Sequence, residues 1–238
     1  MKSFLTSWSL LNDSVNNVNI RLMRPDKIRT TATVRTDPRR DRTRDALLRA
    51  GQRLFAERDV DGVSVDEIVD AAAVAKGSFY NHFADKGVFA REIAAGVRRD
   101  VELLVNQANA EIDDPAADVS RALCVFIRFA MEHRDRARAL WRLNTGATLA
   151  DAPINRGLRE VVERGIERGI FKHVDVETGV LLVMGNFVIT LRHVFDDHTQ
   201  KNPEHIAPQM ASGLLRSLGV PAARAAKLGE AAAREILG

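Results

Sequence analysis

The sequence has few of the residues that build disulfide frameworks, metal centres or flexible catalytic loops. Cys124 is the only cysteine among 238 residues, which excludes an intramolecular disulfide and suits a reducing compartment. Because Cys124 lies in an apolar run, we expect it to be a small buried side chain. The chain has only 15 glycines and 7 prolines, while hydrophobic residues make up 45% of it. This composition favours an all-helical protein with a substantial core.

Motifs of common catalytic sites are also missing. The sequence contains no Gly-rich phosphate loop, no HExxH and no CxxC. His193 and His198 are five residues apart and would lie on different faces of a helix, which argues against a two-histidine metal site. We therefore predict that the chain is not an enzyme and has no catalytic residues, no cofactor and no metal site.

Two further absences concern location and charge. We find no stretch that we expect to span a membrane, and the apolar N-terminal segment is short, interrupted by serines and without a cleavage site. We therefore expect a cytoplasmic protein with no membrane partner. The net charge of +3 is too small to predict nucleic-acid binding by itself. Residues 1–36 show no sustained periodicity, and we predict a disordered or weakly ordered basic tail there.

The most informative stretch is residues 64–86, where the pattern predicts two short helices joined by a tight turn. Ser64 is followed three residues later by Glu67, just before an apolar run, which is the pattern of a capping box. The second helix is predicted over Lys76–His82, with Phe79 and Phe83 turned inward and polar side chains left outside. A docked helix pair of this kind presents a recognition helix to the major groove of DNA.

This stretch resembles the helix-turn-helix of the TetR family of transcriptional regulators. The resemblance rests on Ser64–Ile68, the run Val74–Phe83, and Asp85 with Lys86. The chain departs from the family pattern at Ala73, where the family often has glycine in the turn. It departs again at Ala75, where a polar capping residue is common.

The resemblance implies a set of DNA contacts. Ser64, Tyr80 and Lys86 match positions that contact phosphates, although Tyr80 would equally suit half-buried packing. Lysine can donate to guanine and asparagine can pair with adenine, so Lys76 and Asn81 are the expected base readers. The groove-facing set is Lys76, Gly77, Ser78, Asn81 and His82. Each of these residues has a plainer interpretation as a solvated surface residue.

The helix before this stretch would begin at Asp37-Pro38 and keep one apolar face to about Glu57. Arg39 and Arg40 lie in its first turns, where they would touch phosphates of a docked duplex or form a solvated face. We therefore predict a helix-turn-helix DNA-binding domain over residues 37–84. Residues 85–238 are predicted to form a regulatory domain for ligand binding and dimerisation.

The regulatory domain is predicted to consist of helices alone. A connecting helix is expected from Asp85 to about Ile112, and later helices over 116–133, 134–143, 153–170, 175–195, 203–218 and 221–237. The helix at 175–195 is apolar on nearly every side, so that one face requires a partner. With the helix at 203–218 it resembles the dimerisation pair of the family; the alternative is a large intramolecular core.

A regulatory body of this kind usually encloses a ligand pocket with apolar walls and a few polar groups. The expected lining residues are Phe126, Phe129, Trp141, Asn144, Met184, Asn186 and Phe187; ordinary core packing is the alternative for each. The resemblance thus implies a homodimeric repressor that binds a palindromic double-stranded DNA operator and is released by an unknown small-molecule effector. An architectural DNA-binding dimer without an effector, and a helical carrier or enzyme, remain as alternatives from other classes.

Overall fold

The computed structural model describes residues 38–143, 155–195 and 202–238, and within these ranges every regular element is a helix. The predicted tail at 1–36 and the predicted pocket residue Asn144 lie outside the described residues. The chain from Asp37 to Gly238 forms one compact unit. The expected all-helical fold is confirmed for the described part of the chain.

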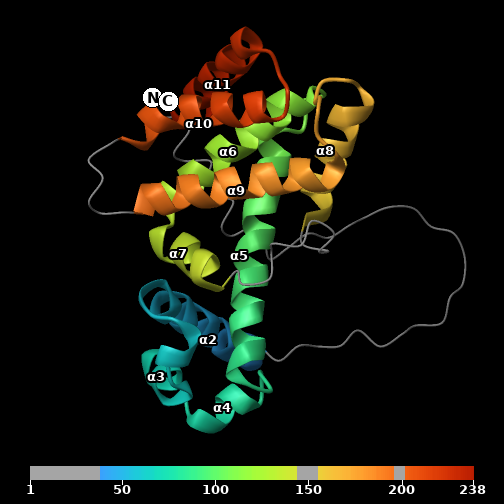
Figure 1. Ribbon diagram of the computed structural model, residues 1–238. Helices are drawn as coiled ribbons and strands as arrows, with labels where there is room; N and C mark the ends of the chain where they lie inside the picture. Colours follow the sequence, from blue (N-terminus) through green and yellow to red (C-terminus); the bar gives the residue numbers. More distant parts are fainter. Residues whose placement is uncertain (1–37, 144–154, 196–201) are drawn as a thin grey trace, which may run out of the picture. The chain divides into compact units, whose positions relative to one another are not determined.

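The N-terminal head contains α2 (Pro38–Glu57), the short 3-10 helix η1 (Val60–Gly62), α3 (Val65–Ala71) and α4 (Lys76–Tyr80) (Figure 1). Its core is an aromatic cluster that includes Phe79, Phe83 and Phe89, all fully buried or nearly so. The ring centroids of Phe83 and Phe89 lie 4.7 Å apart and those of Phe79 and Phe89 lie 5.2 Å apart, in edge-on geometry. These contacts fix α4, which is too short to be stable alone.

The local signals at α3 act as the sequence predicts. The Ser64 hydroxyl accepts from the Glu67 backbone N–H, and the Glu67 carboxylate accepts from the Ser64 backbone N–H, so the capping box is present. Ala73 in the turn has φ of +54°, a left-handed conformation that favours glycine. Ala75 begins α4 without a side-chain cap. The helix ends at Tyr80, two residues earlier than predicted, because Asn81 and His82 turn toward Phe83.

Helix α5 (Lys86–Ala108) begins at Asp85, whose carboxylate accepts from the backbone N–H of Val88 at 2.7 Å. It ends four residues before the predicted end at Ile112. Asn109 caps it and turns its carboxamide to the Asp118 carboxylate, where Nδ2 lies 2.6 Å from Oδ1. This polar contact replaces the next turn of helix.

The remaining helices are α6 (Pro115–Glu132), α7 (Arg134–Leu143), α8 (Arg156–Glu167), α9 (Val176–Phe195), α10 (Pro203–Ser217) and α11 (Ala222–Leu237). α10 and α11 pack on each other and on α6, and α9 crosses α6 (Figure 1). α7 packs against the head: Ala139 belongs to the same buried cluster as Phe79, and Arg142 donates to the Ala56 carbonyl and pairs with Asp59 at 2.9 Å.

Helix α9 corrects the expectation that no stretch has the length and apolar character of a membrane span. Val176–Phe195 is 20 residues long with a mean hydropathy of 1.5 over its most apolar window, and 22% of that window is buried. Val180 and Val183 face the core, while Leu181 and Ile189 are 43% and 55% exposed. The core helix of a soluble protein passes the same test of length and composition. The exposed apolar face is what distinguishes α9.

Candidate functional site: a head surface and a body cavity

The head presents a concave surface between the start of α2 and the end of α4. Arg39, Arg40 and Thr43 of α2, Ser78 of α4, and Asn81 and His82 in the turn after α4 line a depression of about 510 Å³. Five of these six residues are among the DNA contacts that the sequence predicts. Thr43 was not predicted; it lies one turn after Arg39, and its hydroxyl donates to the Arg39 carbonyl at 3.0 Å. The fold thus brings arginines of one helix beside polar groups of another.

His82 in this surface is electrostatically constrained. Burial, followed by the charges of Arg40 and Arg44, lowers the pKa of its imidazole. His82 is therefore neutral at pH 7 and has one donor and one acceptor nitrogen. A neutral imidazole can bond to a phosphate or a base edge without adding charge.

Lys76, an expected base reader, and Tyr80, an expected phosphate contact, are both exposed. Lys76 Nζ lies 2.7 Å from Asp66 Oδ1, with the two side chains 58% and 64% exposed. The hydrogen bond and charge of Asp66 raise the pKa of Lys76, which therefore stays protonated. Tyr80 is 55% exposed, with its ring edge-on to Phe79. Tyr80 thus both packs on Phe79 and leaves about half of its surface open, so its role as a phosphate contact stays a prediction.

Ser64 and Lys86 already serve the structure of the head. Ser64 holds the capping box, and Lys86 Nζ donates to the Val63 carbonyl at 2.7 Å. A phosphate contact by either residue would have to share these groups. Gly77 is open on its surface, since an added Cβ would meet nothing within 4 Å.

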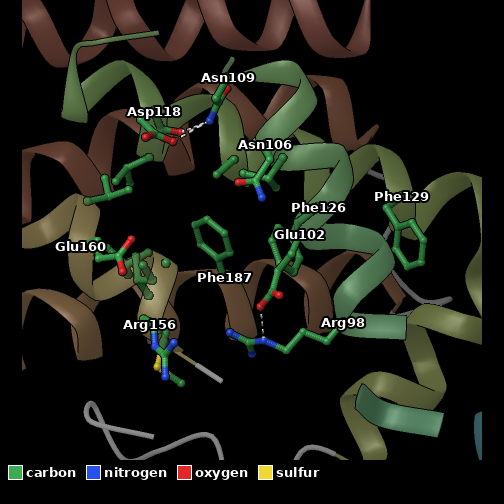
Figure 2. Close-up of a pocket in the computed structure, with 18 of the residues that line it drawn as sticks. Arg98, Glu102, Asn106, Asn109, Asp118, Phe126, Phe129, Arg156, Glu160 and Phe187 are labelled. Atoms are coloured by element: carbon green, nitrogen blue, oxygen red, sulfur yellow. Dashed lines mark hydrogen bonds and ion pairs between the residues drawn. The ribbon is translucent and has the colours of Figure 1, made fainter. Parts of the chain in front are cut away.

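The body contains a cavity of about 760 Å³ lined by residues of α5, α6, α7, α8 and α9 (Figure 2). Five of the seven predicted pocket residues line it: Phe126, Phe129, Trp141, Met184 and Phe187. The rings of Phe126 and Phe187 meet edge-on, with centroids 5.1 Å apart. Asn186 does not line the cavity, because its carboxamide points the other way and donates to the Met210 carbonyl of α10.

The sequence analysis missed the polar part of the cavity wall. Four of these residues lie on α5 at helical spacing: Arg98, Glu102, Asn106 and Asn109. The others lie on α6 and α8: Asp118, Arg156, Glu160 and Arg164. The signal was present in the spacing along α5, where these residues alternate with the buried Val97 and Val101.

Most of the charges on this wall are paired. Arg98 Nε bonds Glu102 Oε1 at 2.9 Å, and Arg164 Nη2 lies 3.2 Å from Asp118 Oδ2. Burial raises the pKa of Asp118 despite the opposing hydrogen bonds and charge of Asn109 and Arg164. The network around Asp118 closes one end of the cavity, and Arg98 lies at the other (Figure 2).

Within the described residues, no group of three or more histidine, cysteine or acidic side chains is arranged to hold a metal ion. Cys124 is fully buried, and burial raises the pKa of its thiol to about 12. The thiol therefore remains protonated and unreactive at neutral pH.

Known proteins are similar to this chain in both the head and the helical body. A family model described as bacterial regulatory proteins of the tetR family matches residues 47–93. The transcriptional regulator AcuR of Cereibacter sphaeroides is 36% identical over 112 residues, which are 43% of this chain and 50% of AcuR. The aligned part of the chain thus spans half the length of that relative.

Solved structures match over more of the chain. RolR in complex with resorcinol has a TM-score of 0.59 and 26% identity, covering 80% of this chain and 94% of RolR. A γ-butyrolactone receptor has a TM-score of 0.61 and covers 83% of this chain and 99% of its own; at 23% identity it shows the fold alone. Both the head and the helical body therefore have solved counterparts.

Proposed function

We propose that this chain, which belongs to the TetR family of bacterial regulatory proteins, binds a palindromic operator as a homodimer and is released from it by a small-molecule effector. It would act as a repressor in the cytoplasm, where the chromosome lies. The observation that carries the proposal is the head surface, which gathers two exposed arginines of α2 and three polar side chains from α4 and the turn that follows it. Arginine binds phosphate and small polar groups read base edges, so the surface has both kinds of contact.

The proposed dimer rests on α9. Its outer face carries Leu181 and Ile189 at the spacing of two helical turns, with Gly185 between them. An added Cβ at Gly185 would meet nothing within 4 Å in the single chain, so a second helix has room to approach there. A dimer would place two heads on half-sites one helical turn of DNA apart. Two weak head contacts would then act together.

The proposed effector site is the body cavity. Its volume of about 760 Å³ lies in the range of small-molecule sites, and RolR, a protein of related fold, is solved in complex with resorcinol. The cavity counts against an architectural DNA-binding dimer without an effector, for which a solid core would be expected. A ligand would release DNA only if it binds the DNA-free state more tightly than the DNA-bound state.

Mobility shift with the upstream region of the protein's own gene tests the DNA-binding part. We expect affinity at least about 100-fold above that for a length-matched scrambled duplex at physiological salt. Asn81→Ala should remove that preference, because the side chain would no longer reach a base. The cavity variant Phe187→Ala serves as the control and should retain it.

Equal binding to both duplexes, fading together with salt, would contradict a specific repressor. Normal duplex binding by Asn81→Ala would contradict the proposed reading surface. If cellular function depended on cavity residues but not on Lys76 or Asn81, a carrier or an enzyme would be the better account.

A further inference from the structure

The cavity has two unlike walls. α5 supplies a polar stripe along one wall, in which Arg98, Glu102, Asn106 and Asn109 follow one another at intervals of one helical turn. α9 supplies an apolar wall from five residues without a charge or an amide: Val183, Met184, Phe187, Val188 and Leu191. Figure 2 shows Glu102 and Asn106 on the side of α5 and Phe187 across the space from them. A ligand that fills this space needs one apolar face and one polar edge.

The charges on the wall leave no net charge for an ionic ligand to neutralise. Three arginines and three acidic residues line the cavity, and Arg98–Glu102 and Arg164–Asp118 are paired. Arg156 and Glu160 lie one turn apart on exposed positions of α8, so their opposite charges also offset each other. Transferring an ion from water into such a site costs free energy that no net opposite charge would return.

Asn106 is the polar group available to a ligand. Among the described residues, no hydrogen bond is formed by its carboxamide, whereas Asn109 is occupied by Asp118 and Arg121. Figure 2 shows the Asn106 side chain turned toward the space above Phe187. The carboxamide offers both a donor and an acceptor, and Glu102, one turn away, offers an acceptor.

We infer that the effector is an uncharged, mainly apolar molecule that carries a hydroxyl group on one edge. This inference rests on the proposed function, because it describes the effector of that regulator. The hydroxyl group would donate to the Asn106 carboxamide oxygen or accept from its nitrogen, while the apolar body lies against Phe187 and its neighbours on the α9 wall. A carboxylate or an ammonium group in the same place would meet the Arg98–Glu102 pair, which offers either ion one like and one opposite charge.

A ligand bound at the polar wall would also act on the head through α5. The polar wall belongs to α5, whose first turns contribute Phe89 and Ile93 to the core of the head. A hydrogen bond to Asn106 therefore acts on the same rigid helix that the head packs against. Apolar contacts alone would hold the ligand mainly to α9.

A set of probes with one carbon skeleton tests the inference. The probes are cumene, 4-isopropylphenol, 4-isopropylbenzoate and 4-isopropylbenzylammonium. Trp8 and Trp141 are the two tryptophans of the chain, so in a Trp8→Phe background Trp141 on the cavity wall is the sole reporter. Its emission is followed during titration, with excitation at the red edge of the tryptophan band, where the probes do not absorb.

We expect the phenol to bind about fivefold more tightly than cumene, as one added hydrogen bond would give. Both ions should bind at least about tenfold more weakly than the phenol. Asn106→Leu should bring the ratio of phenol to cumene affinity to about one and leave cumene binding intact. Gln107→Leu replaces another carboxamide by leucine one residue along α5, outside the cavity lining. It should leave the ratio unchanged.

Three results would overturn the inference. The first is binding of the benzoate or the ammonium as tight as that of the phenol. The second is an unchanged phenol preference in Asn106→Leu, with folding checked by helical circular dichroism. The third is no response of Trp141 to any of the four probes at saturation. None of these measurements uses DNA, so a failure of operator binding would refute the proposed function and leave the ligand chemistry standing.

Discussion

At the scale of single residues, three basic side chains of the head already have partners within the protein. Lys76 pairs with Asp66, Arg58 with Glu67 at 2.7 Å, and Lys86 donates to a backbone carbonyl. The two ion pairs are exposed, and exposed pairs contribute little to stability. Lys76 could therefore leave Asp66 for a phosphate or a guanine of bound DNA at little cost in free energy. The pairing ties the side chain of Lys76, at the start of α4, to α3 before DNA arrives.

Asp66→Asn should raise the affinity for operator DNA by about two- to fivefold at low salt, because Lys76 no longer has to leave a carboxylate. Asp70→Asn removes the same charge from the same helix, and among the described residues Lys76 pairs with Asp66 and not with Asp70. Fluorescence anisotropy with a labelled operator would compare the two variants. An equal gain from both would mean that only net charge matters, and the proposed competition would be wrong.

At the scale of elements, the close approach of α2 to α5 decides the shape of the head core. An added Cβ at Gly51 of α2 would lie 2.4 Å from Phe89 Cζ and 2.7 Å from Ile93 Cδ1. Both neighbours are buried and anchored in the aromatic cluster, so they have little room to move. The sequence places Gly51 inside a helix, where glycine is otherwise unfavourable.

Gly51→Ala should therefore destabilise the protein by about 1–3 kcal/mol, as overpacking does, despite the better helix propensity of alanine. Gly96→Ala on α5 provides the matched control. Its Cβ would meet only Arg99 Nη2, at 3.9 Å, so it should stabilise by about 0.5–1 kcal/mol. Urea unfolding followed by circular dichroism measures both. A stabilised Gly51→Ala variant would show that the α2–α5 contact can open.

At the scale of the whole molecule, the outer face of α9 is an apolar surface that the described residues of a single chain leave exposed. Leu181 and Ile189 are large apolar side chains in a helix that is otherwise part of the core. Large apolar surface in contact with water is unfavourable, and pairing two copies would remove it. We therefore expect two copies to pair through α9, and the proposed DNA binding by two heads to depend on this pairing.

The double variant Leu181→Arg, Ile189→Arg should convert the proposed dimer to a monomer and lower operator affinity by at least about 100-fold, because each head would then bind alone. Leu103→Arg introduces the same charge at an apolar residue of α5 that is 48% exposed, and should leave the dimer intact. Sedimentation velocity and mobility shift measure the two properties. A dimeric double variant would place the proposed interface elsewhere.

The short-range features of this protein follow from the sequence alone. The capping box at Ser64, the inward direction of Phe79 and Phe83, and the start of α5 after Asp85 each depend on residues within about one helical turn of one another. The same local pattern carried the resemblance on which the head's identity rests. The observed helix boundaries differ from the predicted ones by a few residues. At the end of α5, for example, the cap residue Asn109 depends on a partner in the next helix.

The tertiary structure decided which faces meet. Periodicity placed both Asn186 and Phe187 in an apolar helix, but only the packing of α10 against α9 turned Asn186 away from the cavity. Likewise, the polar stripe on α5 became a cavity wall because α8 and α9 lie opposite it. Local pattern fixes the conformation of a helix, whereas the surroundings of a side chain are set by segments far away along the chain.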